Sequence, residues 1–128
     1  MAPVGYSAMP DVYAAARFVM LPVEKTWQYS AGTTVALEAH AAGKAIVAAS
    51  APGMRDFVID GVTGFLVPVG DSTAMRKALA RPWHDPRLAA DMGRAGPAHV
   101  EHAFNPAIVD ATIRQAYVDA CDEYRCRR

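Results

Sequence analysis

The feature that most constrains the fold is the segment Lys44–Ala49, in which five apolar residues follow one lysine without polar alternation. A strand with one face in water alternates apolar and polar residues, so an uninterrupted apolar run predicts a strand that is buried on both faces. Strands of this kind belong to parallel sheets, because the helices of the crossover connections cover both sides. The segment therefore predicts an α/β fold.

Two other short apolar runs, Arg17–Leu21 and Phe65–Pro68, predict strands before and after this segment. Between the strands, Thr33–Gly43 predicts a helix with a threonine cap at its start and glycine at its end. Met54–Ile59 predicts a short helical turn or loop. Strands that alternate with helices favour parallel βαβ units with right-handed crossovers.

After the third predicted strand the sequence predicts helices only. Asp71 or Ser72 caps the first of them, and a second helix follows around Leu88. Gly96 and Pro97 predict an interruption after that helix, because proline lacks a backbone N–H and clashes with the preceding turn.

The last predicted helix begins with Asn105 as its cap and Pro106 in its first position, a favoured pairing. Apolar residues at helical spacing predict a buried stripe along it. The members of that stripe are Val109, Ile113, Ala116, Ala120 and Tyr124.

A chain of 128 residues is one domain at most, and three strands are few for a covered parallel sheet. We therefore expect part of a domain, with one sheet edge left open. The 13 basic and 13 acidic residues give a formal net charge of +0, which argues against broad nucleic-acid binding and polybasic membrane docking. No apolar run approaches the ~18 residues of a membrane span. The start of the chain does not resemble a signal peptide, so the cytoplasm is the expected compartment.

An ordered set of motifs identifies a family resemblance. The helix-to-strand passage Leu37–Val47 contains Glu38-Ala39 and Gly43-Lys44, and the segments Pro52–Asp56 and Asp60–Pro68 follow it. This order resembles the C-terminal part of the retaining GT-B glycosyltransferases of the group 1 type, which use nucleoside diphosphate sugars as donors.

The resemblance implies a partial Rossmann-like fold, with a three-layer parallel sheet of about three strands flanked by helices, and a long C-terminal helix. Residues 1–104 would form the second half of a nucleotide-sugar-binding domain, and residues 105–128 the C-terminal helix and tail. The N-terminal acceptor domain and the first half of the donor domain have no counterpart in this sequence. The expected partners are therefore the sugar donor and either that missing domain or a second chain.

The resemblance also implies site residues. Glu38 would grip the donor ribose, for which a carboxylate has the chemistry because its oxygens accept hydrogen bonds from hydroxyl groups. Gly32, Thr33 and Thr34 would cradle the diphosphate at a helix start. The family often has a first glutamate eight residues before this one, but Ser30 stands there and would be a neutral substitute. A solvated glutamate, an ordinary helix start and a simple loop residue remain the alternative interpretations.

No residue is predicted to be catalytic or to bind a metal, and no cofactor is expected beyond the nucleotide sugar as substrate. His40 is interpreted as a packed histidine, and His99 and His102 lack a third ligand. The resulting expectation is the donor-binding part of a hexosyltransferase that is inactive as an isolated chain. The alternative is a non-catalytic interaction module or relic that pairs with a missing domain through the open sheet edge.

Overall fold

The computed structural model describes residues 5–23 and 32–126. Its elements, in chain order, are the short 3-10 helix η1 (Tyr6–Ala8), α1 (Met9–Ala15), β1 (Phe18–Leu21), α2 (Thr33–Ala41), β2 (Ala45–Ala49), α3 (Met54–Phe57), β3 (Gly64–Val67), α4 (Ser72–His84), α5 (Pro86–Ala103) and α6 (Pro106–Cys126). All three predicted strands are present, and the predicted turn after the second of them is the short helix α3.

The three strands form one parallel sheet in the order β1-β2-β3. Phe18 of β1 pairs with Ala45 of β2, and Ile46 of β2 pairs with Gly64 of β3. Every residue of β2 is buried, which confirms the prediction that this central segment is covered on both faces. The other edge of β1 has no strand partner in the described part of the chain, so this edge of the sheet is open.

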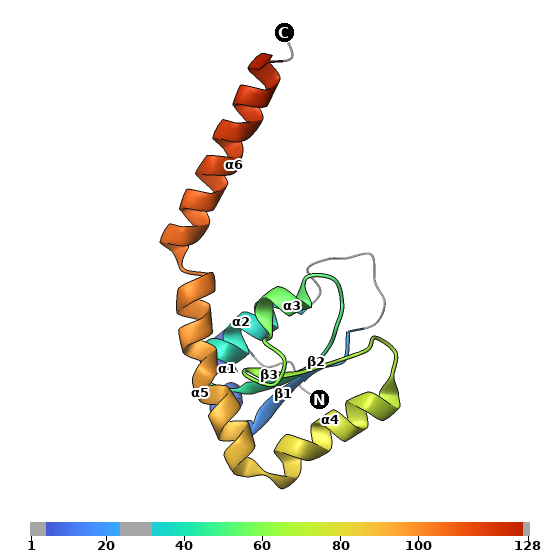
Figure 1. The fold of residues 1–128 in the computed structure, drawn as a ribbon. Coiled ribbons are helices and arrows are strands. Elements are labelled where there is room, and N and C mark those ends of the chain that lie inside the picture. Colours follow the sequence, from blue (N-terminus) through green and yellow to red (C-terminus); the bar gives the residue numbers. More distant parts are fainter. Residues whose placement is uncertain (1–4, 24–31, 127–128) are drawn as a thin grey trace.

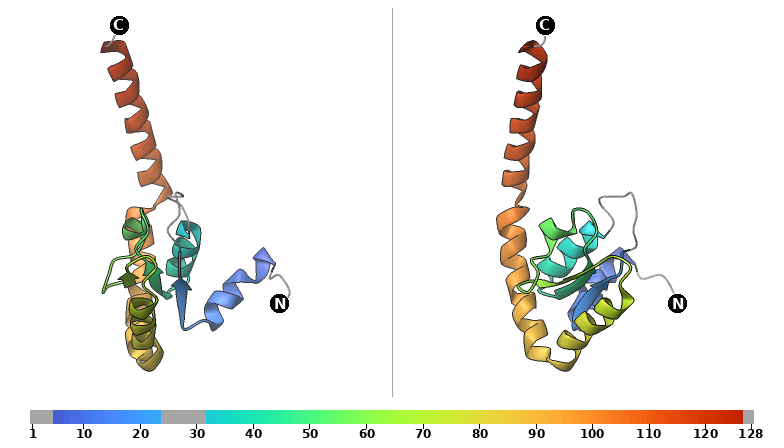
Figure 2. Two further views of the ribbon diagram at one scale, coloured as in Figure 1. Left: turned by 90° about the vertical axis from the view of Figure 1, so that its right-hand side faces the viewer. Right: turned by 45° about the vertical axis from the view of Figure 1, so that its right-hand side comes forward.

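Helices cover both faces of the sheet, because side chains along each strand alternate between the two sides. Ile46 and Ala48 of β2 pack with Met54 of α3 and with apolar residues of α1 and α2. On the opposite face, Val47 packs with Met92 of α5 and with residues of α4. Figures 1 and 2 show α4 and α5 together on this side of the sheet. Complete burial of an aliphatic side chain such as Ile46 contributes about 1.5–3 kcal/mol. The expected three-layer parallel α/β arrangement is confirmed.

Helices α2 and α5 approach each other closely at two glycines of α5. A Cβ atom at Gly93 would lie 2.1 Å from the carbonyl oxygen of Gly43, and one at Gly96 would lie 2.9 Å from the carbonyl oxygen of His40. Only glycine leaves room for this contact, since both obstacles are backbone atoms. This close backbone contact sets the position of α5 relative to the end of α2.

Helix α5 runs without interruption to Ala103, so the predicted break at Gly96 and Pro97 is wrong. Proline removes one helical hydrogen bond, but packing holds the helix on both sides of it. Gly96 is buried against α2, and the ring of Phe104, just past the helix, stacks on Phe57 of α3 at a centroid distance of 4.7 Å. These contacts keep the helix continuous through the proline.

The start of α2 also differs from the prediction. Its N-cap residue is Gly32, not a threonine, and no side chain caps the helix there. The φ angle of Gly32 is 83°, in the left-handed region that glycine adopts without steric cost. The tight entry into the helix, which the sequence pattern did not specify, therefore selects glycine at this position.

Side-chain caps begin two later helices as expected. The carboxylate of Asp71 accepts a hydrogen bond of 2.8 Å from the backbone N–H of Ala74, so Asp71 and not Ser72 caps α4. The side-chain oxygen of Asn105 accepts a hydrogen bond of 2.8 Å from the backbone N–H of Ala107 at the start of α6. Each of these caps stabilises its helix by about 1 kcal/mol.

No element is predicted before Arg17, but the structure has α1 there. The helix is short, with Pro10 in its first turn, and Tyr13 is its one buried residue. A helix of this length has too few residues for an apolar periodicity to be visible in the sequence.

Helix α6 projects away from the body of the molecule, and Figures 1 and 2 show that no other described helix or strand lies against most of its length. The predicted buried stripe is wrong, since Ile113 and Tyr124 are each 62% exposed and Val109 is 41% exposed. The stripe exists, but no element in the described part of the chain covers it. The division of the chain into residues 1–104 and 105–128 stays a prediction.

Candidate functional site

Helix α2 has core residues on one face and predicted site residues on another. Ala36, Ala39 and His40 are buried against the sheet, α3 and α5. Residues three or four apart share a helix face, so Thr34 and Glu38 lie together on another side. This arrangement turns the carboxylate away from the sheet and toward α1.

Glu38 is half-buried beside α1, where the hydroxyl group of Tyr13 donates a hydrogen bond of 2.8 Å to its Oε2 atom. Burial, together with the hydrogen bond and the negative charge of Glu38, raises the pKa of Tyr13 to about 12. The phenol therefore keeps its proton at neutral pH and remains a donor. The second carboxylate oxygen, Oε1, has no hydrogen-bond partner among the described residues.

A pocket of about 290 Å³ adjoins this carboxylate, between α1 and the second half of α2. Apart from Glu38 and the hydroxyl groups of its two tyrosines, the lining is apolar. Its lining residues are Tyr6, Met9, Pro10, Tyr13, Glu38, Ala41 and Ala42. An acid at the wall of a mainly apolar pocket is suited to hold the hydroxyl groups of a ligand.

The start of α2 lies beside the carboxyl end of β1. A Cβ atom at Gly32 would lie 3.3 Å from Val23 and 3.5 Å from Met54, so the protein's own side chains pack closely on that side of the turn. Thr34, in contrast, is exposed. Ligands of open α/β sheets bind beyond the carboxyl ends of the strands, which is where Gly32, Thr33 and Thr34 lie. Ser30 falls outside the described residues.

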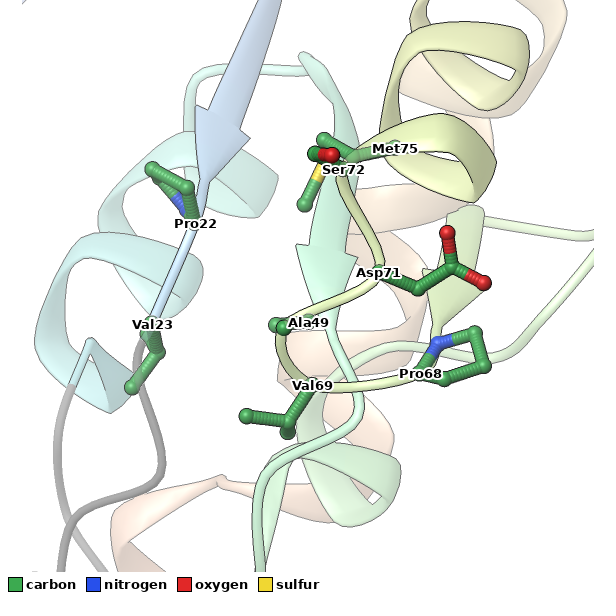
Figure 3. Close-up of a pocket in the computed structure, with 9 residues that line it drawn as sticks. Pro22, Val23, Ala49, Pro68, Val69, Asp71, Ser72 and Met75 are labelled. Carbon is green, nitrogen blue, oxygen red and sulfur yellow. The ribbon is translucent and has the colours of Figure 1, made fainter.

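A larger pocket, of about 610 Å³, opens at the carboxyl ends of the strands (Figure 3). Pro22 and Val23 lie on one side of it, opposite Ser72 and Met75 at the start of α4. None of the described site residues predicted from the sequence lines it. The Asp71 carboxylate already occupies the start of α4 as a cap, which makes this helix end unsuitable for an anion.

His40 serves packing, as interpreted from the sequence. Its side chain is fully buried, and its Nε2 atom lies 2.9 Å from the carbonyl oxygen of Phe57. Burial, with a smaller contribution from the neighbouring His99, lowers the pKa of His40. Residues 5–23 and 32–126 contain no group of three or more side chains that could hold a metal ion.

Tyr13 is the functional candidate that sequence reasoning missed. It lies 25 residues before Glu38 in the chain, in a helix that was not predicted, so no local spacing links the two. The only signal is that Tyr13 is an aromatic residue in a short helix with Pro10 in its first turn. That pattern predicts burial and not a contact with a particular acid.

Comparisons with known proteins all match this chain to glycosyltransferases. The sequence profile of glycosyl transferases group 1 matches residues 2–85. The chain is 41% identical over 125 residues to a D-inositol 3-phosphate glycosyltransferase of Streptomyces avermitilis, and 38% identical over 122 residues to one of Kribbella flavida. These matches cover 98% and 94% of this chain but only 26% and 27% of the relatives, so the chain spans about a quarter of their length.

Solved structures with the GT-B fold superpose on most of this chain. Sucrose-phosphate synthase from Thermosynechococcus elongatus matches with a TM-score of 0.77 and 28% identity, over 96% of this chain and 30% of the synthase. Anabaena HepE, in its complex with UDP and glucose, matches with a TM-score of 0.70 and 24% identity, over 87% of this chain and 29% of HepE, which shows a shared fold.

Within the described ranges, no helix has both the length and the apolar character to cross a membrane. The motifs around Glu38, the parallel sheet with its open edge and the profile match all lead to one assignment. The chain belongs to the family of glycosyl transferases group 1.

Proposed function

We propose that this chain binds the nucleoside diphosphate sugar donor of a glycosyltransferase, with Glu38 accepting hydrogen bonds from the ribose hydroxyl groups. One observation carries the proposal: the half-buried Glu38 carboxylate lies at a pocket, with one oxygen held by Tyr13 and the other without a partner among the described residues. Anabaena HepE, which has the same fold, was also solved in complex with UDP-glucose. That ligand is of the class proposed here.

The start of α2 supplies the second half of the proposed donor site. Backbone N–H groups in the first turn of a helix have no intrahelical acceptor, and the helix dipole favours an anion there. Thr34 lies on the same side of α2 as Glu38, one turn earlier. A donor with its ribose at Glu38 and its diphosphate near Gly32 and Thr33 would follow this side of the helix. By the family resemblance, we further propose that Ser30 takes the place of the first glutamate toward the transferred hexose.

Catalysis in such a site depends on positioning and on stabilising the departing diphosphate, not on a protein nucleophile. The described residues offer no Lys or Arg in the pocket beside Glu38. We therefore expect other parts of the enzyme to supply the charge that neutralises the diphosphate. The isolated chain should accordingly show little or no sugar transfer.

The structure contains surfaces on which such other parts would pack. Among the described residues, no strand pairs with the outer edge of β1. Met20 of β1 is 47% exposed, and the groove between β1 and α4 has a volume of about 600 Å³. Helix α6 is exposed as well. The superposition on sucrose-phosphate synthase covers 96% of this chain and therefore includes most of the 21 residues of α6, within a chain more than three times as long. We propose that the missing acceptor domain and half-domain, or a second chain, cover these surfaces.

The open edge of β1 also favours a second candidate function, a non-catalytic module that pairs with another chain. An unpaired parallel strand presents free backbone donors and acceptors to such a partner. Size-exclusion chromatography with light scattering separates the two functions when combined with nucleotide titration. A stable complex with another chain and no affinity for nucleotides would favour the interaction module.

The ribose role of Glu38 is tested by titrating UDP and GDP into the isotope-labelled chain and following its amide signals. We expect binding with a dissociation constant of about 1 mM, since the chain spans only about a quarter of the length of its relatives. Glu38→Ala should weaken binding about tenfold, because it removes charge-assisted hydrogen bonds.

The matched control is Glu101→Ala, which removes an exposed acid from α5 and should leave the affinity unchanged. Equal affinity in the wild type and Glu38→Ala would remove Glu38 from the site.

A further inference from the structure

We propose that Tyr13 is a positioning residue, which holds the Glu38 carboxylate through Oε2 so that Oε1 is presented to the ribose. The inference rests on the proposed ribose role of Glu38. It adds to the proposed donor site a residue from helix α1, which the sequence motifs do not include.

The geometry that carries the inference is a single contact between α1 and α2. The Tyr13 hydroxyl lies 2.8 Å from Oε2 of Glu38 and can only donate to it, because an ionised carboxylate only accepts. A carboxylate has about four acceptor positions, so one hydrogen bond from Tyr13 leaves the others available. The contact therefore orients the acid without blocking it.

Tyr13 is suited to this role because it does not move easily. Its side chain is only 7% exposed and packs in the same core cluster as Leu21, Ala36 and Met54. Glu38 has a long side chain that is only half-buried and would otherwise sample several rotamers. A fixed partner removes that freedom before the ligand arrives, and this preorganisation is what strengthens binding.

The proton on Tyr13 makes the arrangement independent of pH in the physiological range. Burial and the adjacent carboxylate raise the pKa of the phenol to about 12, so the hydroxyl remains a donor throughout that range. A tyrosine that lost its proton here would repel Glu38. The environment of the pair disfavours this form.

The experiment compares UDP with its 2′,3′-dideoxyribose analogue in the wild type and in Tyr13→Phe. The full 128-residue chain is used, and its amide spectrum verifies the fold of each variant. We expect the wild type to prefer UDP about tenfold, because the analogue lacks the hydroxyl groups that Glu38 would bind. Tyr13→Phe should reduce this preference to about threefold or less and leave the affinity for the analogue unchanged.

The outcomes separate the two proposals. If the wild type binds both ligands equally, or does not bind UDP, the ribose role of Glu38 fails and this inference fails with it. If the wild type prefers UDP and Tyr13→Phe keeps the full preference, only the positioning role is overturned. A purely structural role would weaken both ligands by the same factor, and that result also overturns positioning. Tyr117→Phe, on the exposed helix α6, is the matched control and should change neither affinity.

A measurement on the wild type keeps the inference testable should Tyr13→Phe fail to fold. Exchange of the Tyr13 hydroxyl proton for deuterium should shift the carboxyl carbon signal of Glu38, because the two groups share a hydrogen bond. We expect the isotope shift to persist when UDP saturates the chain. Its disappearance on UDP binding would show that the ligand displaces Tyr13, which contradicts a positioning role.

Discussion

Helices α5 and α6 follow each other in the chain and have similar lengths of 18 and 21 residues, but their surroundings are opposite. Helix α5 lies in the body of the molecule, where Ala89 and Met92 are 2% and 5% exposed. Helix α6 projects from the body, and its Ile113 is 62% exposed (Figure 1). Both carry apolar residues at helical spacing. Such a pattern predicts a surface that needs a partner, but it does not tell whether this chain contains the partner.

We therefore expect a small substitution in α5 to lower the free energy of unfolding more than a larger substitution in α6. Gly93→Ala places a Cβ atom 2.1 Å from the backbone oxygen of Gly43, and a backbone atom cannot move aside as a flexible side chain can. Alanine gains about 1 kcal/mol of helix propensity over glycine, which does not offset a clash of this severity. We expect a loss of about 3 kcal/mol or more in the free energy of unfolding, or no stable fold.

Urea unfolding followed by circular dichroism measures this effect. The control is Ala111→Leu, which adds a larger group to the exposed helix α6 and should change the free energy of unfolding by less than about 0.5 kcal/mol. A Gly93→Ala variant as stable as the wild type would show that α2 and α5 are not in close contact.

Truncation of one side chain in each helix should have unequal effects. Met92→Ala removes a buried side chain and should lower the free energy of unfolding by about 2–4 kcal/mol. Ile113→Ala should lower it by less than about 0.5 kcal/mol, because the side chain is already mostly in water. Equal losses in urea unfolding would contradict the comparison and indicate that α6 packs against something in solution.

A smaller effect is the pH dependence of the free energy of unfolding that arises from His40, which is buried between α2 and α5. Burial lowers the pKa of His40, so between that lowered value and the unfolded-state value of about 6.5 the unfolded chain binds more protons. The free energy of unfolding should therefore fall as the pH is lowered below about 6.5, by at most about 1.4 kcal/mol per pH unit.

Urea titrations at a series of pH values test this, with His40→Met expected to reduce the slope. His102→Gln, in an exposed part of α5, should keep the slope of the wild type. A slope in His40→Met as steep as that of the wild type would assign the pH dependence to other groups.

The sheet was predictable because its signals are local. The run through Ala45–Ala49 has no polar residue, so burial on both faces and parallel pairing followed from the segment alone. The helix carrying Glu38 was predictable for the same reason, apart from its cap. At Gly32 the geometry of the turn decides, and a threonine next to it gives the same sequence signal.

The failures concern contacts between distant segments. Pro97 predicts a break, but the packing of Gly96 on α2 keeps the helix intact, and that packing is not visible in the local sequence. The link between Tyr13 and Glu38 likewise joins residues far apart in the chain. The motifs thus identified Glu38 as a candidate, while its hydrogen-bond partner required the folded structure.

The stack of Phe104 on Phe57 has a mechanical consequence for α6. The helix of 21 residues is about 30 Å long, and it departs from the body directly beyond this pair of rings. A tilt of about 10° at that joint would displace its far end by about 5 Å, given the helical rise per residue. Helix α6 is therefore a long arm attached next to these rings, so a force applied near its tip exerts a large torque on the contact between Phe104 and Phe57.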